Sequence, residues 1–287
     1  MPEKITPSPI TTFGAKFYMI QYYDLHRYIP PMTDSKNVYV ELFAGSAVLF
    51  FNVQCGSAIL NDLDDKIFNF WNVILNKPTY DLFVDELQKA WVGEAWYTKY
   101  IAQPDPISQA IAFYIQNRNA YGGINDDRTT WYNRTKPKPF VKDFTKWKQK
   151  MDQCHLTVWH LDFREALTIL NRQQELDREK YIIFEDPPYV SDNLQSYRHN
   201  FTPQDHEDLA KLNHASTHHI LITYERNPLI ERLYRDWYIQ EMPSRYFVNT
   251  GNPHGTELLI SNHPIRQYSM VGKQYHTKAL GDFLGKK

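Results

Sequence analysis

Short apolar segments rich in β-branched and aromatic residues alternate with helical segments along much of this chain of 287 residues, and this alternation most constrains its fold. Residues 38–43 and 58–60 have the composition of buried strands, and residues 64–75 place apolar side chains at helical spacing. Further strand patterns occur at 156–163, 181–185, 219–225, 245–249 and 257–262, and helical patterns at 164–177 and 203–215. Strands separated by helices predict an α/β fold.

Residues 76–154 differ from the rest of the chain. They contain helical segments followed by a basic stretch, 128–150, with eight Lys or Arg residues, one acidic residue and interleaved aromatic residues, a local net charge of +7. We therefore expect an insert at 76–154 within an α/β unit formed by 1–75 and 155–287. The basic stretch is a phosphate-binding surface or a solvated basic face. The whole chain, with 32 basic and 33 acidic residues, neither suggests nor excludes a polyanionic partner.

The two cysteines, Cys55 and Cys154, argue against a disulfide framework and a cysteine-rich zinc site. We expect two free thiols in a reducing cytoplasm. The N-terminus lacks the apolar segment of a signal peptide, and we find no apolar run long enough to span a bilayer. About the last 20 residues, with Gly281 and Gly285 between basic residues, are expected to form a loosely held tail.

A small-residue turn, ELFAGSA, follows the first strand pattern. Gly45 permits a tight turn at the carboxyl end of the strand, where open α/β sheets bind ligands. Ser46 can cap a helix that continues through Phe50. Asp62 lies 17 residues after Gly45, at the end of the next strand, a spacing that suits an acid bound to the ribose of a nucleotide-like cofactor. A purely structural role for the motif is equally consistent with this pattern.

The segment EDPPY follows the strand pattern YIIF directly. Two prolines cannot continue a central strand, so they present Asp186 at the carboxyl end of the strand, with Tyr189 a fixed distance away. The Asp186 carboxylate and the Pro187 carbonyl form a double acceptor that suits an exocyclic amine, and the ring of Tyr189 suits stacking on its base. The structural alternative is a proline-rich strand exit with a capping aspartate.

Two shorter segments are compatible with ligand binding. In FGAKF, Gly14 and Lys16 precede a helical pattern, and the N–H groups at a helix start together with a lysine can bind a carboxylate or phosphate. In HLDF, Asp162 and Phe163 can bracket a purine ring. An ordinary helix start, a capping aspartate and a core phenylalanine are the structural alternatives.

Taken together in their order along the chain, these segments resemble the Dam-like DNA adenine-N6 methyltransferases, the α-arranged D12 class with a DPPY motif. FGAKF resembles the family's GGK-type motif, YVELFAGSAVLF its cofactor motif, LND its ribose-binding acid, HLDF its adenine-binding motif and FYIQNRNAYGGI the start of its target-recognition region. FTPQDHEDLA and TELLISN also match family segments. The departures are Ala15 and Ala47, where the family has glycine, and ITYERN, where a serine-asparagine pair is usual.

The resemblance implies a Rossmann-like S-adenosylmethionine-dependent methyltransferase sheet with an inserted, mainly helical target-recognition subdomain. It implies site-specific methyl transfer from S-adenosylmethionine to N6 of an adenine flipped out of double-stranded DNA. The cofactor-binding residues it implies are Phe13, Gly14, Lys16, Phe43, Gly45, Asp62, Asp162, Phe163 and Asp186. The catalytic residues are Asp186, Pro187 and Tyr189. Candidate DNA-binding residues are Arg118, Asn119, Tyr121, Arg128, Arg134, Lys136 and Lys138.

This chemistry needs no metal ion and no nucleophilic residue. We expect a cytoplasmic protein of a prokaryote or phage, with a cognate restriction endonuclease as the candidate protein partner and no obligate partner evident. Alternatives are cytosine-N4 methylation, which more often has Ser in place of Asp186, an RNA substrate, and a catalytically inactive DNA-binding relative.

Overall fold

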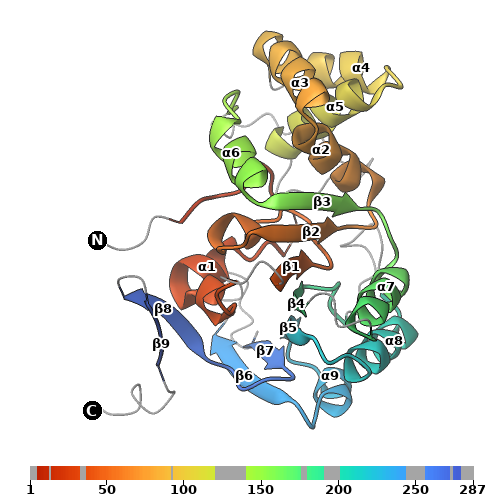
Figure 1. The fold of residues 1–287 in the computed structure, drawn as a ribbon. Helices are drawn as coiled ribbons and strands as arrows, with labels where there is room; N and C mark the ends of the chain where they lie inside the picture. Colours follow the sequence, from red (N-terminus) through yellow and green to blue (C-terminus); the bar gives the residue numbers. More distant parts are fainter. Residues whose placement is uncertain are drawn as a thin grey trace.

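A mostly parallel sheet forms the centre of the molecule (Figure 1). The computed structural model describes residues 5–12, 14–32, 37–91, 93–119, 140–175, 180–190, 201–243, 256–271 and 274–278. Within these ranges, the seven strands of the sheet have the order β3-β2-β1-β4-β5-β7-β6. Their bounds are β1 Asn37–Glu41, β2 Ser57–Asn61, β3 His155–Trp159, β4 Lys180–Glu185, β5 His219–Glu225, β6 Tyr238–Pro243 and β7 Thr256–Ser261.

The strand directions define the class of sheet. Strands β1 to β5 pair in parallel, and β7 lies antiparallel between β5 and β6. The order of doubly wound sheets, 3-2-1-4-5-6, differs only by the insertion of β7. The predicted Rossmann-like sheet is therefore confirmed.

Hydrophobic side chains cover both faces of the sheet because successive residues of a strand point to opposite faces. In β4, Ile182 belongs to one cluster and Ile183 to the other. The Ile183 cluster lies under α7 Phe163–Glu175, α8 Pro203–His214 and α9 Pro228–Leu233. The Ile182 cluster includes residues of α1 Phe17–Tyr23, of the 3-10 turns η1 Leu25–Tyr28 and η2 Phe50–Asn52, and of the helices that follow β2.

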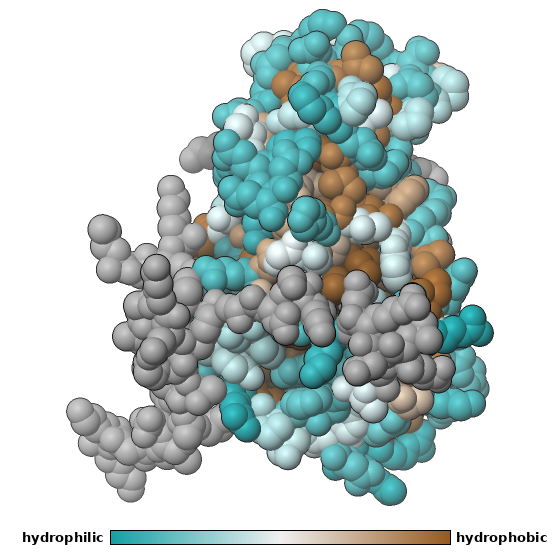
Figure 2. Space-filling model, viewed as in Figure 1, coloured by the Kyte–Doolittle hydropathy of each residue, from teal (hydrophilic) through white to brown (hydrophobic). Residues whose placement is uncertain are grey.

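A helical segment connects β2 to β3. It consists of α2 Asp65–Leu75, α3 Lys77–Lys89, α4 Glu94–Ile101, α5 Pro106–Asn119 and α6 Thr145–Gln153. Helices α2 to α5 gather beyond the β3 edge of the sheet (Figure 1). The described part of 76–154 contains helices and no strand, as expected for the insert, and the division into a catalytic domain and a target-recognition subdomain stays a prediction. In the space-filling view, apolar residues form a band between these helices and the lower part of the molecule (Figure 2).

Aromatic residues of α2 and of the insert pack together as part of the Ile182 cluster. Phe70 of α2, which precedes the insert, is fully buried, and its ring lies 5.5–6.4 Å from the rings of four aromatic residues of the insert. These are Phe83, Phe113, Tyr114 and Phe144. Phe144 and Trp147, two aromatics of the basic stretch, are buried here as core residues.

Three local expectations differ from the structure. Instead of a helix capped by Ser46, the chain makes turns and then η2, because the backbone at Ala47 has a positive φ of 50° that interrupts a right-handed helix. Strand β6 was not predicted: it is an edge strand ending at Pro243, with Tyr238 and Ile239 exposed, so it lacks a buried pattern. The expected tail begins instead as a hairpin of β8 Gln267–Val271 and β9 Gln274–Lys278. The predicted strand 245–249 lies outside the described residues.

Cys55 and Cys154 are thiols in contact, with their sulfur atoms 2.7 Å apart. The sheet register explains the contact, because Ser57 pairs with His155 and the two cysteines precede these paired strand starts. Among the described residues, none of the helices has the length and apolar character that a membrane crossing requires.

Candidate active site

Four of the predicted site residues lie at one edge of the sheet. Gly45, Asp62, Asp162 and Asp186 follow β1, β2, β3 and β4, which are adjacent and parallel. The carboxyl ends of adjacent parallel strands meet at the same edge, which is where open α/β sheets bind ligands.

The turn after β1 requires glycine at position 45. Gly45 has a φ of +49°, and a Cβ atom added there would lie 2.9 Å from the Thr12 hydroxyl oxygen. Its N–H donates to Asp62 Oδ2 at 2.7 Å, and its carbonyl accepts from Trp71 Nε1 at 2.9 Å. Hydrogen bonds to Asp62, which follows β2, and from Trp71 of α2 thus fix the turn.

Ala47, a departure from the family pattern, also has a left-handed backbone, with a φ of 50°. This conformation costs a non-glycine residue about 1–2 kcal/mol, which gives a physical reason for the family's glycine. Ala47 is fully buried, so its methyl group offsets part of this cost by packing in the core.

The Asp62 side chain connects the loop after β1 to the end of β2 by a hydrogen bond. Besides accepting from Gly45, its carboxylate accepts from the backbone N–H of Asp64 at 2.9 Å through Oδ1. The preceding residue, Asn61, was missed by the sequence analysis. Its amide donates to the carbonyls of Leu42 and Leu161, each at 3.0 Å, and its oxygen accepts from Leu161 N–H. Asn61 therefore ties the loops after β1 and β3 to the end of β2.

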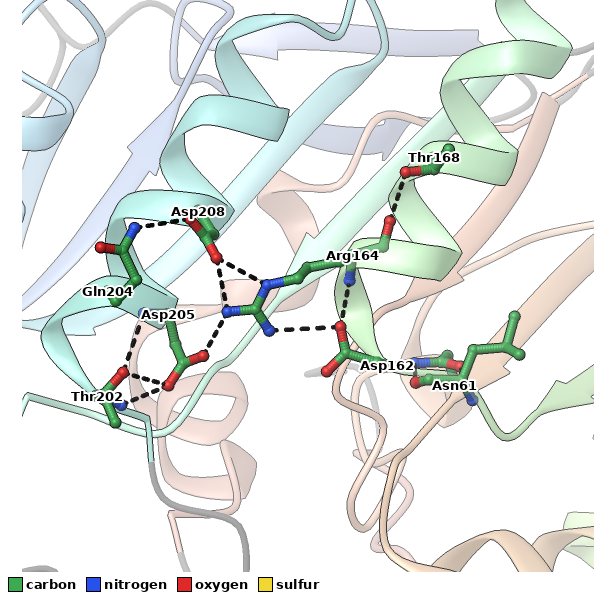
Figure 3. Close-up of polar contacts among 9 residues, drawn as sticks. Asn61, Asp162, Arg164, Thr168, Thr202, Gln204, Asp205 and Asp208 are labelled. Carbon is green, nitrogen blue, oxygen red and sulfur yellow. Dashed lines mark hydrogen bonds and ion pairs between the residues drawn. The ribbon is translucent and has the colours of Figure 1, made fainter.

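Asp162 caps α7 and contacts Arg164, whose guanidinium also pairs with two aspartates of α8 (Figure 3). Its Oδ1 accepts from the backbone N–H of Arg164 at 2.9 Å and lies 3.5 Å from Arg164 Nη1. The same guanidinium pairs with Asp205 and with Asp208 of α8. The sequence suggested a capping role for Asp162, but gave no sign that Arg164 would link the adenine-binding motif to α8.

Three phenylalanines form a cluster beside this edge. The ring of Phe163 lies 6.1 Å from that of Phe43 and 5.1 Å from that of Phe201, and the Phe43 and Phe201 rings are 5.6 Å apart. Phe43 and Phe163 were predicted site residues. Phe201 was not predicted, although it is the first residue of the family-like segment FTPQDHEDLA. It contributes the third aromatic ring of the cluster.

Asp186 lies between Lys16 and Thr223. Its Oδ1 is 2.8 Å from Lys16 Nζ, which also donates to the Gly14 carbonyl, and 3.0 Å from the Thr223 hydroxyl that donates to it. Burial raises the pKa of Asp186 above its ordinary value, the positive charge of Lys16 opposes this rise, and the negative charge of Glu257 adds to it. The structure thus brings Lys16 of the N-terminal motif directly onto the carboxylate of the DPPY motif.

Tyr189 is held at its hydroxyl. The hydroxyl donates to Glu257 Oε2 at 2.7 Å, and Lys16 Nζ lies 4.9 Å from the centre of the ring. Glu257, on β7, was not among the predicted residues. Its only sequence signal is its place in the family-like segment TELLISN.

Two further carboxyl groups are buried at this edge. Glu41, at the end of β1, accepts from the Tyr39 hydroxyl and from the backbone N–H of Phe50. Glu185, at the end of β4, accepts from Asn213 at 2.8 Å. Burial raises the pKa of each side chain from 4.5 to about 8. Both groups therefore hold a proton in the folded protein at pH values where an exposed glutamate has lost it.

Glu185→Gln should flatten the pH dependence of stability. The unfolded chain loses the Glu185 proton near pH 4.5 and the folded protein near pH 8, so this group's contribution is complete below pH 4.5 and is lost as the pH rises toward 8. The fall in unfolding free energy between pH 5 and pH 8, measured with urea, should be smaller in the variant by on the order of 1–3 kcal/mol. Gln at the exposed Glu94 is the control, and equal slopes for both variants would contradict the expectation.

The predicted DNA-binding residues are only partly described. Arg118, on α5, donates to the Pro9 carbonyl at 3.4 Å, and Asn119 is buried. Nearby Asn117 exchanges two hydrogen bonds with the backbone of Thr11. The C-terminal part of α5 thus holds the backbone of Pro9 and Thr11 by hydrogen bonds. Base contacts by Arg118 and Asn119 stay predictions. Phe13, Tyr121, Arg128, Arg134, Lys136 and Lys138 lie outside the described residues.

The described lysines of the basic stretch have intramolecular contacts. Lys148 is buried and pairs with Asp152, and Lys150 donates to the Val53 carbonyl. Lys142 donates to the Gln88 carbonyl, and Lys146 lies over the ring of Trp147. Part of the local charge therefore serves the packing of α6 and its neighbours.

Comparisons with known proteins identify the family of this chain. A model of the D12 class N6 adenine-specific DNA methyltransferases matches residues 23–246, and the chain belongs to this family. DNA adenine methylases of Salmonella typhi and Salmonella typhimurium are each 26% identical to it over 117 residues. These matches cover 39% of this chain and 40% of each relative, so the chain spans about two fifths of the length of these curated proteins. The crystal structure of SMU.776 with SAH is 10% identical, at a TM-score of 0.37, over 85% of this chain and 49% of that one.

Proposed function

We propose that this protein transfers a methyl group from S-adenosylmethionine to N6 of an adenine flipped out of double-stranded DNA. Family membership supports the adenine-specific reaction. The observation that carries the proposal is the arrangement at the end of β4, where Asp186 is followed by two prolines and Tyr189. An amine needs acceptors and its base needs a stacking surface, and both are present here.

The strand ends fit the cofactor. Gly45 forms the turn at the end of β1 with a left-handed backbone, and Asp62 carries a carboxylate beside it. Phe43, Phe163 and Asp162 offer aromatic faces and an acceptor for an adenine ring. When bound, S-adenosylmethionine supplies an activated methyl group on a sulfonium.

The chain's own residues act on the target base. The carboxylate of Asp186 and the carbonyl of Pro187 accept the two N6 hydrogens, which favours a tetrahedral nitrogen with its lone pair directed at the methyl group. Tyr189 stacks on the ring and fixes the distance of attack. Positioning and electrostatics then account for most of the rate enhancement. The insert, with its basic stretch at 128–150, binds the DNA phosphates.

Sequencing of modified bases in DNA from cells that express this chain tests the proposal. We expect N6-methyladenine within one short sequence context, absent when Asp186 is replaced by alanine. N4-methylcytosine would favour the related reaction on cytosine. Binding of duplex DNA and S-adenosylmethionine with no methylated base would indicate an inactive relative.

Asp62→Ala should weaken S-adenosylmethionine binding about ten-fold or more, measured by calorimetry. The change removes a carboxylate that we expect to accept from the ribose, and it frees the Gly45 N–H that fixes the turn. Asp64→Ala is a matched control, because Asp64 caps α2 by accepting from Lys66 and Ile67. Its loss should lower stability by about 0.5–2 kcal/mol and leave affinity unchanged. Equal affinities of wild type and Asp62→Ala would contradict the ribose role.

A further inference from the structure

Glu257 reaches the candidate active site because β7 is antiparallel to its neighbours. Glu225, at the end of β5, pairs with Glu257 near the start of β7. The beginning of β7 therefore lies at the edge where the parallel strands end. Thr223, which donates to Asp186, pairs with Leu259, so Glu257 points to the same face of the sheet as Thr223. Glu257 lies beyond the range matched by the family model, 23–246.

The carboxylate of Glu257 contacts two predicted site residues. Its Oε2 accepts from the Tyr189 hydroxyl at 2.7 Å, and its Oε1 lies 4.0 Å from Lys16 Nζ. The Glu257 side chain is 17% exposed. A hydrogen bond to an ionised acceptor in such partly buried surroundings is stronger than one between neutral groups in water.

This hydrogen bond restrains the ring of Tyr189. A tyrosine side chain is attached to the backbone only at Cβ and can turn about two side-chain bonds. Here the hydroxyl end is also fixed, while Lys16 lies over the ring and Tyr224 packs nearby with its ring centre 6.1 Å away. The plane of the ring is thereby set before any base arrives, which is the condition for efficient stacking.

We infer that Glu257 is a positioning residue that holds Tyr189 in the orientation needed to stack on the target base. The inference rests on the proposed function and deepens it, because it adds a residue that acts through Tyr189 and touches no reacting atom. Loss of the carboxylate removes the restraint on the hydroxyl end of Tyr189, so a flipped base is held less firmly.

A double-mutant cycle tests the inference. Glu257→Ala, Tyr189→Phe and the double variant are compared by single-turnover methyl transfer to a duplex that contains the sequence found by modified-base sequencing. Each single change should slow transfer up to about ten-fold, and the double variant should be no slower than the slower single variant. Glu257→Gln, which keeps an acceptor, should recover part of the rate. Cofactor affinity should be unchanged in Tyr189→Phe.

A second readout separates positioning from a general loss of structure. With 2-aminopurine at the target position, its fluorescence on binding reports how the flipped base stacks, and Glu257→Ala and Tyr189→Phe should change it alike. Glu225→Gln is the matched control, since it removes the facing carboxylate but no bond to Tyr189. It should leave rate and fluorescence unchanged.

The outcomes are distinguishable. The role of Glu257 is overturned if the rate losses of the two single variants multiply in the double variant, or if Glu257→Ala transfers methyl at the wild-type rate. Either result leaves the proposed function standing. If Glu225→Gln slows transfer as much as Glu257→Ala does, the negative charge at this edge of the sheet matters rather than the hydrogen bond to Tyr189. That result would also overturn the role of Glu257. A wild-type protein that methylates no adenine would overturn the proposed function and this inference together.

Discussion

Asp186→Ala should lower the single-turnover rate of methyl transfer to duplex DNA by on the order of 10²–10³. Asp186 is presented at the end of β4, and its carboxylate is expected to accept a hydrogen from the target amine. That interaction strengthens as positive charge develops on the nitrogen, so its loss falls on the rate of transfer more than on cofactor binding. Transfer at the wild-type rate would show that the DPPY segment is only a rigid strand exit.

The Asp186 variant needs a stability control, because it also leaves the buried Lys16 without this carboxylate. Asp186→Asn keeps the shape and an acceptor oxygen, and its thermal unfolding separates lost chemistry from lost folding. The pH profile of the wild type gives a second check. Since burial raises the pKa of Asp186, the transfer rate should fall on the acid side at a higher pH than an exposed aspartate would give.

Phe70→Ala should destabilise the protein by about 3–5 kcal/mol, measured by urea unfolding. Phe70 is fully buried, and its ring packs against those of Phe83, Phe113, Tyr114 and Phe144. Its removal leaves a cavity between α2, α3 and α5, which pack together with rigid aromatic side chains. These cannot close around the lost volume without leaving their own contacts.

Leu82→Ala on neighbouring α3 is the matched control for Phe70. Leu82 is 55% exposed, so its truncation should change stability by less than about 0.5 kcal/mol. A small effect of Phe70→Ala, similar to that of Leu82→Ala, would mean that the aromatic cluster between α2 and the insert contributes little to the cooperative unfolding that urea reports.

Local patterns determined the elements that carry the site. The strand before Asp186 and the turn at Gly45 follow from features within a few residues: β-branched apolar runs, two prolines, and a glycine, which permits a left-handed backbone. Such signals depend on the geometry of a short segment, so the sequence alone is sufficient for them. The same holds for the helical insert, although the pattern did not show that Phe144 and Trp147 would be buried core residues.

Contacts between distant segments were decided by the tertiary structure. Tyr189 and Glu257 are 68 residues apart, and they meet only because β7 enters the sheet antiparallel beside β5. The sequence shows a strand at β7 but neither its neighbour nor its direction, and reversing the strand would move Glu257 to the opposite edge. Lys16 reaches Asp186 for a similar reason, because the packing of α1 against the sheet, rather than any local motif, sets the position of its side chain.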